Sequence, residues 1–184
     1  MDAFIVNTGD QFEWKQPKAI ARLFELKRGE DLFGTLEFRS FWGTLAFSKD
    51  PVQNWSFKRV GFLNPQVTVR MPGADSDYAL FFPRLFSGGI LRPPDGRLVN
   101  WEPLNFWRTE WQFSEIRGFP ILSFHQRYQP EGKVKFSEIF KIHAHAKVES
   151  NHITNLEFSI LVNLGFYLLV MQAMDSAAIA AASS

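Results

Sequence analysis

The chain has 184 residues, a formal charge of +1 and no cysteine, and 46% of its residues are apolar. These values are typical of one folded domain and not of a disordered chain. The lack of cysteine excludes disulfides, thiolate catalysis and cysteine-ligated zinc. Acidic and basic residues alternate without long blocks, so we expect no nucleic-acid partner.

Aromatic residues are unusually frequent. The chain contains 20 phenylalanines and six tryptophans. Each aromatic side chain can bury about 150–250 Å². We therefore expect either a large core or aromatic rings that face a partner.

Residues 1–18 are predicted to form an N-terminal extension or an additional strand, and residues 19–184 a single domain. The first residues do not resemble a signal peptide, because Asp2, Asp10 and Glu13 occur where a basic and then an apolar stretch would be needed. The expected location is therefore the cytoplasm.

From residue 19 to residue 149, short β-type runs alternate with turn signals. Apolar and polar residues alternate in residues 32–38, and strong turns occur at Pro72-Gly73 and at 92–96. A later run, residues 106–116, is also predicted as a strand. About ten to twelve such strands predict an antiparallel barrel or sandwich.

The chain then becomes apolar over a long stretch. No charged residue occurs from Phe158 to Met174, and the polar residues Glu157, Ser159, Asn163 and Gln172 do not collect on one stripe of a helix. We predict a helix over residues 154–174, followed by a tail of small residues. A helix that is apolar all round must be buried in protein or lipid.

Three sites of burial are possible for this helix. It could pass through a barrel, dock on a partner, or anchor the chain in a membrane, for which 17 uncharged residues is near the lower limit. A wide barrel can hold a central helix. We predict a mainly β fold, namely a closed antiparallel barrel of about twelve strands around a hydrophobic C-terminal helix. The function would then lie on the outer wall or the rims.

The predicted helix contains the sequence Leu-Val-Asn-Leu-Gly-Phe-Tyr-Leu-Leu-Val at residues 161–170. With this helix after many strands, the chain resembles the tubby C-terminal-like superfamily over about residues 19–174. That superfamily includes tubby domains, phospholipid scramblases and LURP-one-related proteins. The resemblance implies a barrel around an apolar helix, association with lipid or membrane surfaces, and transcription-linked or defence roles.

The chain also departs from that superfamily. The cysteine-rich acylation segment associated with scramblases is impossible in a chain without cysteine. No lysine–arginine pair matches the phosphoinositide site of tubby domains. We therefore do not carry scrambling activity over to this chain.

Basic and imidazole side chains are predicted to share one face of the last strand or strand pair, residues 133–149. This predicted basic stripe consists of Lys133, Lys135, Lys141, His143, His145 and Lys147. It suits phosphate or anionic lipid headgroups, although an ordinary solvated strand face has the same pattern. His143 and His145 have the spacing of metal ligands, but the flanking lysines would repel a dication, so no metal is predicted.

No catalytic motif is present in the sequence. Asp75 and Asp77 lie in a turn, and no nucleophile elbow, phosphate-binding loop or dinucleotide fingerprint occurs. We predict a non-enzymatic binding or scaffold protein, without a cofactor, that associates peripherally with anionic lipid or a membrane surface. The alternatives are a carrier or enzyme with an empty lumen and a tail-anchored membrane protein.

Overall fold

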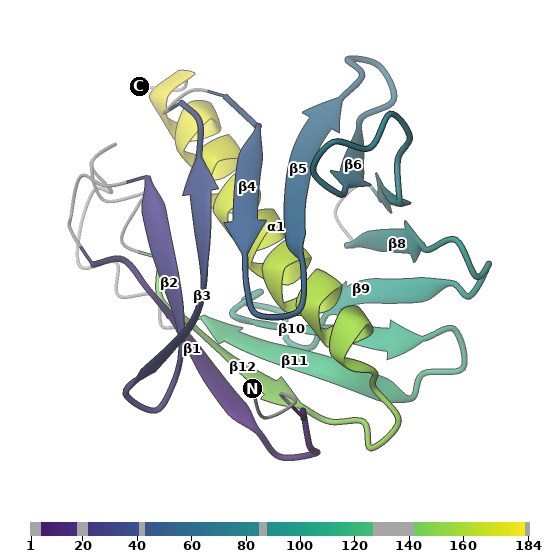
Figure 1. The fold of residues 1–184 in the computed structure, drawn as a ribbon. Helices are drawn as coiled ribbons and strands as arrows, with labels where there is room; N and C mark the ends of the chain where they lie inside the picture. The colour runs from purple at the N-terminus through teal and green to yellow at the C-terminus, as the bar shows by residue number, and fades with distance from the viewer. Residues whose placement is uncertain (1–4, 18–21, 41–42, 85–87, 127–141, 183–184) are drawn as a thin grey trace.

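Antiparallel strands form a closed barrel around one helix in the part of the chain that the structure describes (Figure 1). This computed structural model describes residues 5–17, 22–40, 43–84, 88–126 and 142–182. The strands are β1 (Gln11–Lys15), β2 (Leu23–Arg28), β3 (Asp31–Phe38), β4 (Ala46–Lys49), β5 (Asn54–Val60), β6 (Gln66–Arg70), β7 (Ala79–Pro83), β8 (Gly89–Arg92), β9 (Val99–Pro103), β10 (Glu110–Glu115), β11 (Pro120–Gln126) and β12 (Ala144–Val148). The predicted barrel of about twelve strands is confirmed.

The barrel closes through β1. Residues 11–15 belong to the segment 1–18 that the sequence assigns to an extension or an additional strand. They pair with β2 on one side and with β12 on the other. The remaining neighbours in the barrel are neighbours in the sequence. The barrel therefore has no open edge in the described residues.

Alternation along the strands sends the large rings inward. In β5, the side chains of Trp55 and Phe57 point into the barrel and are fully buried, whereas the side chain of Lys58 points outward and is exposed. The largest fully buried side chains are aromatic, and they come from the strands and from the helix: Phe12, Trp14, Phe24, Phe38, Trp55, Phe57, Phe81, Phe113, Phe124, Phe158, Phe166 and Tyr167. A large core thus accounts for much of the aromatic content.

The helix α1 (Asn155–Ala182) begins with a capping box. The hydroxyl of Thr154 accepts a hydrogen bond from the backbone N–H of Glu157 at 3.1 Å, and Thr154 and Glu157 have the spacing of the motif. The helix then runs through the barrel from one end to the other (Figure 1).

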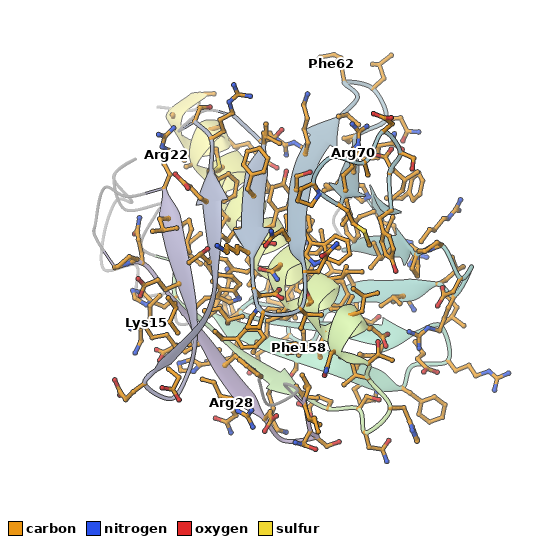
Figure 2. All side chains as sticks on the ribbon, in the orientation of Figure 1. Lys15, Arg22, Arg28, Phe62, Arg70 and Phe158 are labelled. Carbon is orange, nitrogen blue, oxygen red and sulfur yellow. The ribbon has the colours of Figure 1, made fainter. Side chains whose placement is uncertain are left out.

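Rings from several strands enclose α1. Near its start, Phe158 packs against Phe12 of β1 and Phe33 of β3 (Figure 2). Further along, Phe166 stacks on Trp14 at a centroid distance of 4.5 Å. These contacts fill the lumen with side chains.

Gly165 allows α1 to lie close to β10 and β11. A Cβ atom at Gly165 would lie 2.4 Å from Phe124 Cζ and 3.0 Å from Phe113 Cε2. No side chain fits there without moving these rings. The glycine therefore lets the helix lie centrally between the walls.

The end of α1 differs from the prediction. The helix continues eight residues beyond Met174, so the described part of the small-residue tail is helical. Alanine has the highest helix propensity, which explains the extension of residues 177–182. By length and composition α1 could cross a membrane, but 72% of its most apolar 18-residue window is buried inside the fold.

Candidate functional site

The polar residues of α1 serve the fold. The Asp50 carboxylate, in the turn between β4 and β5, accepts hydrogen bonds from Ser159 Oγ at 2.7 Å and Asn163 Nδ2 at 2.8 Å. Trp55 Nε1 donates to the same Ser159 hydroxyl at 2.8 Å. Ser159 and Asn163, which interrupt the apolar pattern in the sequence, thus fix the rotation of the helix in the barrel.

Tyr167 is a second polar group within the barrel. Its hydroxyl donates a hydrogen bond to the Thr44 carbonyl at 2.7 Å. Burial raises the pKa of Tyr167 well above its ordinary value, so the phenol stays protonated. A protonated, hydrogen-bonded tyrosine here is a structural group and not a base.

Half of the predicted basic stripe can be placed. Lys133, Lys135 and Lys141 lie outside the described residues. His143 precedes β12, and His145 and Lys147 occupy outward positions of that strand, between the buried residues Ala144, Ala146 and Val148.

Carboxylates from neighbouring segments balance the placed part of the stripe. Lys147 Nζ lies 2.9 Å from Glu149 Oε2, and His145 Nε2 lies 3.8 Å from Glu13 Oε1 on β1. Burial raises the pKa of Glu13. The hydrogen bond and charge of Lys15 and the charges of His145 and His143 outweigh this effect and lower the pKa. The described part of the wall around β12 therefore carries mixed charges.

The two ends of the barrel have separate sets of connections. We define the C-terminal rim as the described connecting residues at the end where α1 ends: residues 16–17, 22, 39–40, 43–45, 61–65, 84, 88, 104–109 and 142–143. The N-terminal rim comprises residues 5–10, 29–30, 50–53, 71–78, 93–98, 116–119 and 149–154, at the end where α1 begins. In Figure 2, Arg22 and Arg28 flank β2 and mark the two ends.

The C-terminal rim is basic in its described residues. Its charged side chains are those of Arg22, Arg39, Arg84 and Arg108, and no Asp or Glu occurs in the described connections. Arg39 and Arg84 are exposed. Asp175 of α1 also lies at this end, and it pairs with Arg59 of β5 at 2.6 Å. An excess of positive charge therefore remains at this rim.

Large apolar side chains also project from the C-terminal rim. Phe62 and Leu63 are 97% and 93% exposed, and Phe106 and Trp107 are 89% and 80% exposed. Figure 2 shows Phe62 at the tip of the connection between β5 and β6. The predicted strand 106–116 is wrong at its start, because residues 104–109 form a connection and β10 begins at Glu110.

The N-terminal rim has the opposite charge. Its acidic residues are Asp10, Glu30, Asp50, Asp75, Asp77, Asp95 and Glu149. Only Arg97 and Arg117 are basic among the residues of this rim. The two aspartates noted in the sequence have different surroundings. Asp77 forms an ion pair with Arg70 at 2.5 Å, whereas Asp75 is exposed.

Two hollows of about 250 and 400 Å³ lie beside Arg97 at the N-terminal rim. The Arg97 guanidinium donates to Glu157 and lies 3.9 Å from Asp95 Oδ2 and 3.8 Å from Glu115 Oε1. Burial raises the pKa of Glu157, although the charge of Arg97 opposes the shift. Three carboxylates surround this arginine, and Arg117 is the other cation that lines the larger hollow.

No metal site is found among the described residues, where no group of three or more His, Asp or Glu side chains could hold an ion. His125 lies near Glu110, at 3.5 Å, on the outer wall. This pair is exposed to solvent and lies outside both hollows.

Comparison with family models, curated proteins and solved structures gives no match. The resemblance to the tubby C-terminal-like superfamily therefore stays a prediction. From the sequence, the function was expected on the outer wall or the rims, but the arginines and exposed rings of the C-terminal rim were not singled out. The excess of aromatic residues was the available signal, because it implied rings that face a partner if the core could not hold them all.

Proposed function

We propose that this protein is a non-enzymatic binding module that associates peripherally with anionic membrane surfaces through its C-terminal rim. The main observation in support is the positive charge of that rim, whose described connections contain four arginines and no Asp or Glu. Arginine suits this role because its guanidinium binds phosphate oxygens through paired hydrogen bonds.

The filled lumen supports a role on the surface. A carrier or enzyme of the alternative kind needs an interior cavity, whereas aromatic side chains of α1 and the strands occupy this interior. The tail-anchor alternative needs α1 free to enter a bilayer, whereas most of its apolar residues pack inside the barrel.

The C-terminal rim suits an anionic membrane better than the wall around β12 does. On the β12 wall, Glu13 and Glu149 lie beside His145 and Lys147. An anionic membrane would therefore meet carboxylates there. The described connections of the C-terminal rim contain arginines and no Asp or Glu.

Vesicle co-sedimentation tests this proposal. We expect binding to phosphatidylcholine vesicles that contain phosphatidylserine, weaker binding to phosphatidylcholine alone, and loss of binding as salt rises. In the double variant Arg39→Glu and Arg84→Glu, loss of two basic groups costs about 1 kcal/mol each, which weakens binding by roughly 30-fold, and the added negative charge weakens it further.

The matched control is the double variant Lys49→Glu and Arg117→Glu. Both residues are exposed at the opposite end of the barrel, and the change in net charge is the same. The control should bind like the wild type. Equal losses in both variants would show that only net charge matters, and equal binding of the wild type to neutral and anionic vesicles would overturn the proposal.

A further inference from the structure

The exposed apolar residues of the C-terminal rim form two tips on separate connections. We define the tips as Phe62 with Leu63, between β5 and β6, and Phe106 with Trp107, between β9 and β10. Four large apolar side chains that are at least 80% exposed are unusual at one end of a domain with so large a core. Clustered exposed apolar groups mark interaction sites.

The backbone holds the second tip in a defined shape. The Asn105 side chain accepts a hydrogen bond from the Thr109 N–H at 3.0 Å and donates to the Thr109 hydroxyl at 2.8 Å. Arg108 has a φ of 55°, which is uncommon for a residue other than glycine. Phe106 and Trp107 contact each other edge to face at 5.4 Å. The connection is thus ordered although its rings face solvent.

The first tip is also a tight turn. Gly61 has a φ of 85°, and a Cβ atom there would lie 2.6 Å from the Asn64 carbonyl oxygen. Only glycine fits this close approach of the backbone. The turn therefore directs Phe62 and Leu63 outward from the end of β5.

The arrangement of the tips favours a fluid surface as the occupant. Four strand spacings separate the two connections along the barrel wall, a distance of about 19 Å. The connection that contains Arg84 lies between them. A bilayer accommodates separate projecting tips and offers phosphates to the arginines, and tryptophan prefers the interface of a bilayer.

The end of α1 extends the same surface. After Asp175 the described helix carries no charge to Ala182, and Ile179 is 71% exposed. This segment leaves the barrel at the same end as the two tips. It adds uncharged surface where a bilayer would lie.

We infer that Phe62, Leu63, Phe106 and Trp107 insert into the interface of an anionic phospholipid bilayer, with the barrel standing on its C-terminal rim. This inference rests on the proposed function and adds penetration and orientation to it. In this arrangement the arginines contact headgroups, while the acidic N-terminal rim points away from the membrane.

Trp107 provides the test. Bilayers of phosphatidylcholine and phosphatidylserine with brominated acyl chains quench the fluorescence of a tryptophan that inserts. Trp14, Trp55, Trp101 and Trp111 are buried, and Trp42 lies outside the described residues, so the difference between the wild type and the variant Trp107→Phe gives the contribution of Trp107. We expect quenching and a blue shift in the wild type, and loss of that component in the variant.

A variant of the apolar tips distinguishes their insertion into the bilayer from electrostatic binding by the arginines. We expect Phe62→Ser, Leu63→Ser and Phe106→Ser together to weaken vesicle binding by at least roughly tenfold and to abolish quenching of Trp107. The residual binding should still depend on phosphatidylserine and salt. The control Ile116→Ser with Phe119→Ser, at the N-terminal rim, removes side chains that are 58% and 63% exposed and should change neither reading.

The vesicle experiments distinguish failure of membrane insertion from failure of the proposed function. Binding to anionic vesicles without quenching of Trp107 would overturn insertion and leave the proposed function in place. Insertion into neutral vesicles as strongly as into anionic ones would overturn the proposed charge dependence alone. Self-association of the wild type that the tip variant abolishes, with no vesicle binding, would overturn both and identify a second copy of the chain as the occupant.

Discussion

The two ends of the barrel use their charged residues differently. At the N-terminal rim, carboxylates contact other parts of the fold: Asp50 binds α1, Asp77 pairs with Arg70, and Asp10 pairs with Arg28. At the C-terminal rim, the charged residues of the described connections are all arginines, and large apolar side chains are exposed beside them.

This difference supports the C-terminal rim as the end for the proposed membrane contact. Charges that hold the helix start and the turns are committed to stability. The N-terminal rim also exposes apolar side chains, including Phe119, but its seven carboxylates outnumber its two arginines. An anionic surface would be repelled there and attracted at the other end.

The largest expected effect comes from a cavity in the core around α1, the helix that runs from one rim to the other. Phe166 is fully buried and packs on Trp14 and Phe24, so Phe166→Ala should lower the free energy of unfolding by about 3–5 kcal/mol. Guanidinium denaturation measures this change. The control Ile179→Ala, on the exposed part of α1, should change it by less than about 0.5 kcal/mol.

Asp50 tests the structural role of the N-terminal rim. Asp50→Ala leaves donors of Ser159 and Asn163 without their acceptor and removes the bond to the Val52 N–H, so we expect a loss of about 3 kcal/mol. The contrasting variant is Arg84→Ala at the C-terminal rim, which should unfold at the same denaturant concentration as the wild type. Equal destabilisation by both would contradict the division of roles between the rims.

The smallest expected effects concern two carboxylates, Glu13 and Glu157, whose contributions to the free energy of unfolding should change with pH in opposite directions. The lowered pKa of Glu13 means that its contribution to stability is present above the ordinary pKa and is lost as pH falls through the folded value. The raised pKa of Glu157 means that stability decreases as pH rises from the ordinary pKa through the folded value.

Denaturation of Glu13→Gln and Glu157→Gln at several pH values measures both signs. Relative to the wild type, Glu13→Gln should become more destabilising as pH rises. Glu157→Gln should become less destabilising over the same range. Parallel pH profiles for the two variants would show that the environments of these carboxylates are not opposite.

Much of the fold could be predicted from local patterns. Residues 32–38 alternate as a half-buried strand does, and β3 covers Asp31–Phe38. The uncharged stretch from Phe158 to Met174 required burial, and α1 lies inside the barrel. The start of β10 was not predictable, because Phe106 and Trp107 have high strand propensity while Asn105 and Arg108 form a turn.

The candidate surface depended on pairing between distant residues. Lys147 and His145 looked like part of a basic stripe, but Glu13, more than a hundred residues earlier, lies beside His145 once β1 pairs with β12. Similarly, the arginines and the apolar tips of the C-terminal rim are scattered along the sequence. They share one end of the molecule only because the strands alternate in direction around a closed barrel.

Local patterns in the sequence were sufficient to predict a β-rich chain and a helix that had to be enclosed, because hydrophobic periodicity and the need to bury apolar surface can be seen in short stretches of residues. Tertiary structure alone decided which charges neutralise one another and which gather at one rim. Those outcomes depend on strand register and on the direction of each connection, and neither is written in any local stretch of residues.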